Sequence, residues 1–278
     1  MTRLSLGPVV PLLSLVRAHA CATAAVLALL GAFLAGEPAG SPALLPVATA
    51  VFLVTAGGNS LNDACDTGPD RVNRRGRPIP SGALSQRTAV AVGALCLVAG
   101  AIAGTRLTPW CSAICLSNVL LVVAYARWSK RLGLAKDLLV GYLVGSTVLF
   151  GALEPDRVDA PVAALAACAA LATAARELLK DVEDLPGDRA AGARTLPIAI
   201  GERKSEALSY LLLFSAVALA FAPPVTRALG TTYAAVAAAG ALAFVLSWAS
   251  KRPRTKQVLV MAGSVVEMAA FWAGRTLP

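Results

Sequence analysis

PVAALAACAALATAARELLKDVEDLPGD, residues 161–188, is the stretch that decides the fold. It begins as an apolar run of small residues, long enough to cross a membrane, and ends in Asp181, Asp184 and Asp188. The spacing D-x2-D-x3-D would place all three carboxylates on one face of a helix. Like charges at this spacing repel, and each carboxylate near hydrocarbon costs roughly 2.5 to 3.5 kcal/mol on insertion scales. The pattern therefore predicts that positive charge is held beside the aspartates.

The same pattern occurs in the first half of the chain. Residues 42–70, PALLPVATAVFLVTAGGNSLNDACDTGPD, run from an apolar segment into Asp63, Asp66 and Asp70. We call these aspartates the first ladder, and Asp181, Asp184 and Asp188 the second ladder. A single ladder could be a set of solvated loop charges, because the glycine and proline residues within it are typical of helix ends (Gly68, Pro69, Pro186 and Gly187). Two copies, each ending an apolar segment and each followed by arginine, favour a shared site.

The composition indicates a polytopic membrane protein. The 278 residues are 57% hydrophobic and 15% charged, whereas an ordinary soluble domain has roughly 25% charged residues. The abundance of alanine and glycine favours helices that pack closely in a bilayer, and the alternating segments of a β-barrel are absent. Nine apolar segments are long enough to cross a hydrocarbon core of about 30 Å, at residues 9–36, 42–61, 88–104, 109–126, 134–153, 161–179, 207–222, 231–249 and 257–273.

We therefore expect an all-α polytopic membrane protein with a single domain over residues 1–278. Its nine transmembrane helices would form two pseudo-repeated four-helix halves around a central cavity, with the ninth helix closing the ring. The first segment is longer than the apolar core of a signal peptide, so it is expected to be retained. None of the six cysteines forms a C-x2-C pair, which predicts neither a zinc site nor a disulfide framework.

The basic residues are distributed unevenly along the chain. The net charge is +9, and 21 of the 25 lysines and arginines fall on the side of the predicted membrane that also carries both ladders. The positive-inside rule places this side, and the N-terminus, in the cytoplasm. We expect an integral protein of the plasma membrane whose active site opens to the cytoplasm. No nucleic-acid partner is expected, because no nucleic-acid-binding motif accompanies these membrane-flanking charges.

The ladders and their basic flanks predict a particular chemistry. Carboxylate oxygens favour Mg²⁺ or Ca²⁺, and Mg²⁺ commonly bridges a few carboxylates and a substrate phosphate. Arginine and lysine bind phosphate oxygens directly, and such residues follow the first ladder and surround the second (Arg71, Arg74, Arg77, Arg176, Lys180, Arg189 and Arg194). A diphosphate beside an apolar bundle suggests a polyprenyl diphosphate. Cations would stabilise its departing diphosphate, and the bundle would exclude water from the allylic cation.

Three motifs at this point resemble the UbiA superfamily of intramembrane prenyltransferases. They are NDACDTGPDRVNRRGRPIPSG at residues 62–82, YARWSK at residues 125–130 and KDVEDLPGDRAAGARTLP at residues 180–197. Within the superfamily, RELLKDVED at residues 176–184 is most similar to digeranylgeranylglyceryl phosphate synthases. Two positions depart from the family pattern, because Ala20 and Asp137 stand where asparagine is common; both changes concern the expected acceptor side.

The resemblance implies roles for individual residues. The six ladder aspartates are expected to bind Mg²⁺ and to be catalytic: Asp63, Asp66, Asp70, Asp181, Asp184 and Asp188. Diphosphate is expected to be held by Arg77, Lys130, Arg176 and Lys180, with Arg71 as a further substrate-binding residue and Asn62 orienting metal or diphosphate. Tyr125 either binds diphosphate or belongs to an interfacial aromatic belt, and Glu177 is expected to pair with Arg176 or Lys180.

Three functions remain open from the sequence. The first is Mg²⁺-dependent transfer of a C15 to C20 prenyl group, from farnesyl or geranylgeranyl diphosphate, to an aromatic or polar-lipid acceptor. The second is a membrane terpene cyclase of the same superfamily, in which the substrate's own double bonds capture the cation. The third is a transporter, which the clustering of the carboxylates at one membrane face disfavours. Incubation with a prenyl diphosphate and no acceptor separates the first two.

Overall fold

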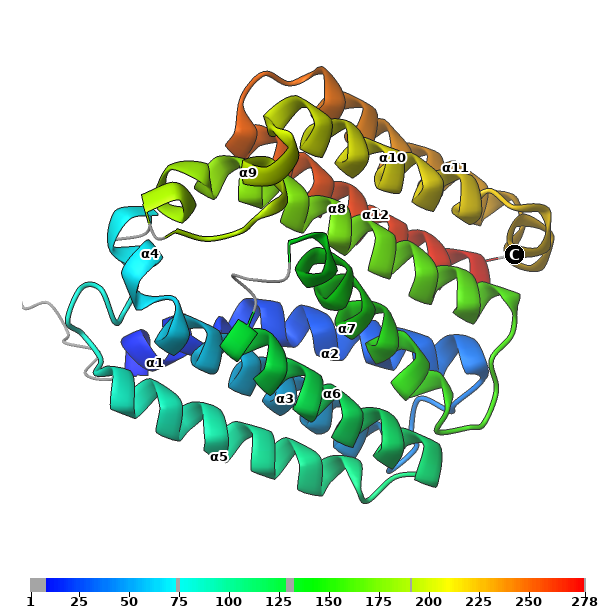
Figure 1. Cartoon of the computed structure of the whole chain (residues 1–278). Coiled ribbons are helices and arrows are strands. Elements are labelled where there is room, and N and C mark those ends of the chain that lie inside the picture. The colour runs from blue at the N-terminus through cyan, green and yellow to red at the C-terminus, as the bar shows by residue number, and fades with distance from the viewer. Residues whose placement is uncertain (1–8, 74–75, 129–132, 191, 278) are drawn as a thin grey trace, which may run out of the picture.

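The computed structural model describes residues 9–73, 76–128, 133–190 and 192–277, and within these ranges the chain is helical with no β-strand (Figure 1). This confirms the all-α prediction. The helices are α1 (Val9–Val16), α2 (Ala18–Ala35), α3 (Leu44–Cys65), α4 (Thr67–Asn73), α5 (Gln86–Gly104), α6 (Pro109–Trp128), α7 (Leu134–Ala152), α8 (Ala160–Ala190), α9 (Leu196–Ile200), α10 (Glu202–Ala220), α11 (Pro223–Ala249) and α12 (Pro253–Thr276).

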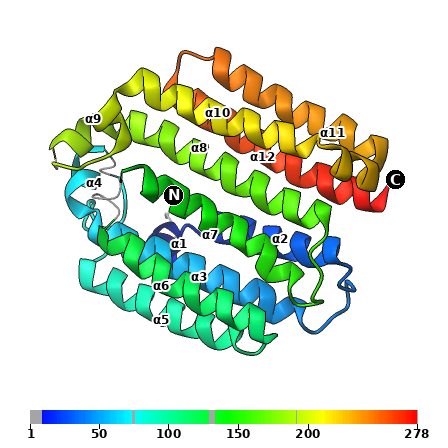
Figure 2. The same ribbon diagram turned by 45° about the vertical axis from the view of Figure 1, so that its right-hand side comes forward.

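Eight of these helices are long and apolar enough to cross a membrane, namely α2, α3, α5, α6, α7, α8, α11 and α12. The segment predicted at residues 207–222 corresponds to α10, which packs against α8 alongside the other long helices (Figures 1 and 2). Its first two turns carry charges from Glu202 to Glu206, and it is not among the eight candidate spans. The count of nine membrane spans and the two pseudo-repeated halves remain predictions.

The first predicted segment is divided, so the expectation of one span over residues 9–36 is wrong. The break falls at Arg17, which adopts a left-handed backbone conformation (φ 52°, ψ 59°) between α1 and α2. This conformation is energetically unfavourable for a residue other than glycine. The Arg17 side chain forms an ion pair with Asp63 of α3, which offsets that cost and turns the chain at this point. The first helix that could cross the membrane therefore starts at Ala18.

The four tryptophans support a membrane orientation of the bundle along its helix axes. Each is at least half exposed, and each lies near a helix end: Trp110, Trp128, Trp248 and Trp272. Tryptophan is enriched at the two membrane–water interfaces. Trp110 and Trp128 are 18 residues apart on α6, which at the helical rise corresponds to about 27 Å, close to the thickness of a hydrocarbon core.

Glycines bring α2, α7 and α8 into close contact. A Cβ at Gly141 would lie 2.5 Å from the Ala170 carbonyl oxygen, and one at Gly145 would lie 2.6 Å from the Ala166 carbonyl oxygen, so α7 touches the α8 backbone directly. On another face of α7, a Cβ at Gly151 would overlap the Ala28 carbonyl oxygen of α2. Small residues at these contacts confirm the close helix packing predicted from composition.

Gly151→Ala is therefore expected to destabilise the protein by about 1 to 3 kcal/mol. The added methyl group meets backbone rather than a flexible side chain, so α2 and α7 must separate. The thermal unfolding midpoint in detergent measures the effect. Gly40→Ala is the matched control, because no atom lies within 4 Å of a Cβ at that position. Equal midpoints for the two variants would contradict this account of the α2–α7 contact.

Candidate metal and substrate site

The second ladder lies on one continuous helix, as its spacing predicts. Asp181, Asp184 and Asp188 belong to α8, which continues to Ala190 without a break at Pro186. The reading of Pro186 as a helix end is therefore wrong. Asp181 is 4% exposed and Asp188 is 1% exposed. The helix thus carries carboxylates into the protein interior at the end of α8, which we call the ladder end of the bundle.

The first ladder is built differently, and the expectation of three carboxylates on one helix face is wrong there. α3 ends at Cys65, Asp66 is its C-cap residue with φ −90° and ψ 14°, and Asp70 lies on the separate helix α4. The physical reason is Pro69, which has no N–H to donate to the Cys65 carbonyl group. The break turns α4 away from the axis of α3, yet Asp63 and Asp70 both remain buried.

Two arginines hold the first ladder together. Arg77 donates from Nη1 to Asp63 Oδ1 at 2.9 Å and to Asp70 Oδ2 at 2.7 Å, which ties α4 to the end of α3. Arg17 donates to the same Asp63 oxygen at 2.5 Å. Burial raises the pKa of the Asp70 carboxyl above its usual value, although the Arg77 guanidinium opposes this shift. The positive charge predicted beside the first ladder is thus supplied by arginines.

A lysine plays the corresponding role at the second ladder. Lys136, in the first turn of α7, is 5% exposed, and its ammonium group donates hydrogen bonds to both carboxylate oxygens of Asp181. The Lys136 ammonium also lies 3.4 Å from Asp137, whose carboxylate is fully buried and has no hydrogen-bond partner among the described residues.

The sequence reasoning missed Lys136 and Arg17 as site residues, because both were counted only as membrane-flanking charges. One signal could have identified Lys136. It stands next to Asp137 inside a predicted membrane segment, and ionisable residues within such segments are functional-site candidates by default.

Glu177 forms the ion pairs expected for it. Arg176 donates to Glu177 Oε1 at 2.9 Å, and the Lys180 ammonium donates to Glu177 Oε2 at 2.6 Å. Glu177 is 4% exposed, whereas the side chains of Arg176 and Lys180 remain 36% and 22% exposed. The glutamate therefore orients two cations while leaving both of them accessible.

The structure brings the two ladders to the same end of the molecule. α4 packs against α8 there, next to α9 (Figures 1 and 2). Tyr125, near the end of α6, lies within electrostatic range of Asp66 from the first ladder and of Asp181 from the second. Tyr125 is therefore near enough to both ladders to interact with their charges. Arg71 is exposed on α4, whereas Arg74 and Lys130 lie outside the described residues.

The donor set suits a hard divalent cation, although its carboxylates are not gathered around one point. Among the described residues, no group of three His, Cys, Asp or Glu side chains is close enough to hold a metal ion. Instead, Arg17, Arg77 and Lys136 neutralise the aspartates. Asn62 donates from Nδ2 to Asp66 at 3.0 Å and leaves its buried Oδ1 without a partner among the described residues. That oxygen is a ligand of the type Mg²⁺ prefers.

These features define a helical membrane protein with two carboxylate ladders, each containing buried aspartates, and their cations at one end. The model of the UbiA prenyltransferase family matches residues 24–266, and the chain belongs to that family. It is 40% identical over 241 residues to the digeranylgeranylglyceryl phosphate synthase of Methanothrix thermoacetophila, covering 85% of this chain and 87% of that protein. The protein is therefore an intramembrane prenyltransferase.

Solved structures agree with this assignment. A digeranylgeranylglyceryl phosphate synthase structure superposes with a TM-score of 0.75 at 28% identity, covering 96% of this chain and 98% of the other. A UbiA homolog from Archaeoglobus fulgidus bound to DMAPP and Mg²⁺ has a TM-score of 0.71 at 16% identity, covering 96% and 99% of the two chains. The latter likeness supports the fold alone.

Proposed function

We propose that this prenyltransferase moves a geranylgeranyl group from its diphosphate to a hydroxyl group of a glyceryl phosphate lipid. The single observation that carries the proposal is the pair of ladders at one end of an apolar bundle, each already paired with cations: Arg17 and Arg77 at the first and the buried Lys136 at the second. The acceptor class is supported by the 40% identity to a digeranylgeranylglyceryl phosphate synthase over most of both chains.

In this reaction the C1–O bond of the donor breaks, and diphosphate leaves with the electron pair. The acceptor hydroxyl oxygen forms the new C–O bond and releases its proton. The ladder aspartates and Asn62 would hold Mg²⁺, and the bound Mg²⁺ would neutralise the charge of the departing diphosphate. The phosphate oxygens of the substrates are contacted by basic and phenolic side chains, namely Arg71, Arg77, Tyr125, Lys130, Arg176 and Lys180. The helices exclude water from the allylic cation.

A divalent metal requirement is supported by the hard-oxygen donor set and by the UbiA homolog bound to DMAPP and Mg²⁺. The resting ion pairs suggest how the site changes on loading. Arg77 contacts both Asp63 and Asp70. If these two carboxylates held a metal ion, the Arg77 guanidinium would be available to phosphate oxygens. The site faces the cytoplasm in this proposal, because the basic residues gather at the ladder end.

The test is a product assay with purified protein, Mg²⁺ and geranylgeranyl diphosphate, run with and without a geranylgeranylglyceryl phosphate acceptor. The expected result is a digeranylgeranyl lipid only when the acceptor is present, and no product when a chelator removes the metal. Farnesyl diphosphate and an aromatic acceptor run in parallel test chain length and acceptor class. A cyclic hydrocarbon formed without acceptor would establish the terpene cyclase instead, and uncleaved substrate crossing a vesicle membrane would indicate a transporter.

A further inference from the structure

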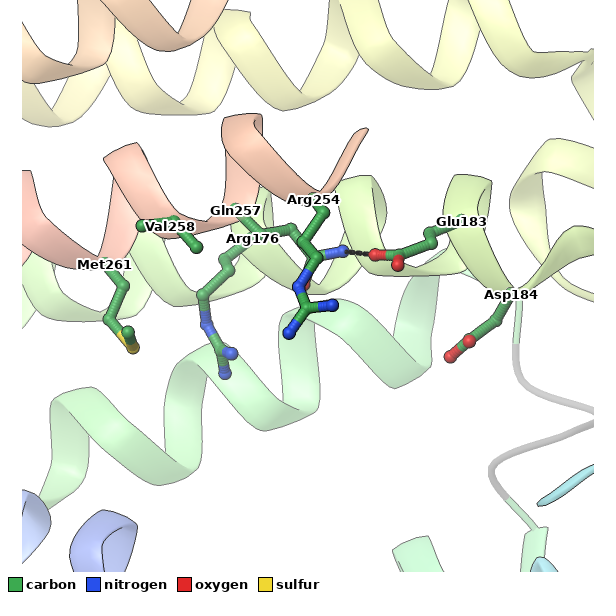
Figure 3. Close-up of a pocket in the computed structure, with 7 residues that line it drawn as sticks. All are labelled: Arg176, Glu183, Asp184, Arg254, Gln257, Val258 and Met261. Atoms are coloured by element: carbon green, nitrogen blue, oxygen red, sulfur yellow. Dashed lines mark hydrogen bonds between the residues drawn. The ribbon is translucent and has the colours of Figure 1, made fainter. Parts of the chain in front are cut away.

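A pocket of about 530 Å³ lies between α8 and α12 at the ladder end (Figure 3). Its lining comes from one face of each helix. On α12 the lining residues are Arg254, Gln257, Val258 and Met261, which recur at the spacing of a single helical face. On α8 they are Arg176, Glu183 and Asp184. The volume is within the range of about 300 to 1,000 Å³ that is usual for small-molecule sites.

The pocket has a charged end and an apolar end. The guanidinium groups of Arg176 and Arg254 point toward the same side of the helix pair, and Asp184 points there as well (Figure 3). Glu183 accepts a hydrogen bond from Gln257, which ties the two helices together at one edge. Val258 and Met261 form the apolar wall, and they are 51% and 54% exposed.

Arg254 is available for a ligand. Within the described part of the chain it has no ion pair and no side-chain hydrogen bond, although Arg176 is held by Glu177 at 2.9 Å. Arg254 also lies in the first turn of α12, a helix of 24 residues. Backbone N–H groups and the helix dipole at such a position favour an anion. Two guanidinium groups thus line one pocket, and one of them, Arg254, belongs to the first turn of a helix.

From this arrangement we infer that the α8–α12 pocket binds the phosphate monoester of the acceptor lipid, with Arg254 and Arg176 as its phosphate ligands. The inference rests on the proposed function. An acceptor of this class has one anionic group attached to a long apolar chain. The pocket has Arg176 and Arg254, together with Asp184, at its charged end and an exposed apolar wall at the other. The lipid chain would leave past Val258 and Met261 toward the bilayer.

The position of the pocket also matches the chemistry. Glycerol has only three carbons, so the reacting hydroxyl of the acceptor lies within a few bonds of its phosphate. The acceptor phosphate must therefore bind beside the donor site without occupying it. The pocket satisfies this requirement. Asp184 belongs to the second ladder and also lines the pocket, so the pocket lies directly beside the ladder. The donor diphosphate is left to the other cations of the two ladders, such as Arg77 and Lys180. In this inference Arg176, which the sequence placed at the diphosphate, binds the acceptor phosphate instead.

The test compares Arg254→Ala with the wild type on two acceptors, the glyceryl phosphate lipid and its alcohol counterpart without phosphate. For the phosphate acceptor, KM is expected to rise about 10- to 100-fold, as for the loss of a charge-assisted hydrogen bond. The KM for geranylgeranyl diphosphate and the KM for the alcohol acceptor should stay unchanged. Arg254→Lys should recover part of the loss. Arg252→Ala is the matched control, since Arg252 is an exposed neighbour outside the pocket.

Binding provides a second readout that does not need turnover. Calorimetry with the glyceryl phosphate lipid, without donor or metal, should show weaker binding to Arg254→Ala than to Arg252→Ala. The inference is overturned if the acceptor affinity is unchanged, if the alcohol acceptor loses as much as the phosphate, or if the donor KM rises instead. Should the wild type make no product from this acceptor, the proposed function fails, whereas the calorimetry still decides whether Arg254 binds the phosphate.

Discussion

Asp63→Ala is expected to lower kcat/KM for prenyl transfer by at least about 10²- to 10³-fold, the usual effect of removing an electrostatic contact to the reacting groups. Asp63 is the point where Arg17 from the α1–α2 junction and Arg77 from the loop after α4 meet. Its loss removes a carboxylate from the donor set and releases both arginines from α3. The measurement is product formation with geranylgeranyl diphosphate, acceptor and saturating Mg²⁺.

Two variants make the Asp63 result specific. Asp63→Asn keeps the size and the hydrogen-bond acceptor but removes the charge, so it should be nearly as inactive as the alanine variant if the carboxylate acts on a cation. Glu202→Ala removes an exposed carboxylate at the start of α10 and should retain full activity. Wild-type turnover by Asp63→Ala would reject the role of the first ladder.

Lys136→Met is expected to destabilise the protein by about 3 to 5 kcal/mol, because it leaves buried carboxylates without their counter-charge. Lys136 is the ion-pair partner of Asp181 and lies 3.4 Å from Asp137. The double variant Lys136→Met with Asp181→Asn removes the charges of the principal pair. This variant should recover only part of the lost stability, because Asp137 still lacks its cation. Prenyl transfer should be absent, because the Asp181 carboxylate is missing.

Thermal unfolding in one detergent measures stability, and the product assay on the same samples measures transfer. Lys204→Met, which removes an exposed lysine from α10, is the control and should change neither quantity. A double variant no more stable than Lys136→Met would mean that the Lys136–Asp181 pair is not the source of the loss. An active double variant would remove Asp181 from the catalytic set.

Much of the architecture could be predicted because it depends on local patterns. Apolar length marks the membrane helices, and the D-x2-D-x3-D spacing correctly placed the second ladder on one helix. The same rule failed for the first ladder, where Pro69 ends α3 and moves Asp70 to α4. At Pro186 the opposite occurs, because α8 continues through this proline. The effect of a proline on a helix therefore depended on packing that periodicity does not describe.

The cations of the site also show what local sequence patterns can and cannot predict. The pairing of Glu177 with Arg176 and Lys180 was predictable, because these residues are neighbours on one helix. Arg17 pairs with a residue 46 positions away, and Lys136 pairs with one 45 positions away. No local pattern distinguishes these two from the other basic residues that flank the membrane helices.

The amino-acid sequence by itself determined that the chain is an all-helical membrane protein, that it carries two carboxylate ladders, and that basic residues accompany both of them. Its apolar lengths and helical spacings suffice for this, because both are properties of single segments. Only the tertiary structure decided which cation serves which aspartate, and that Arg254 of α12 faces Arg176 of α8 across a pocket. These ion pairs and this pocket form where helices that are distant in the chain meet at one end of the bundle. Close packing between the helices determines which of them meet there.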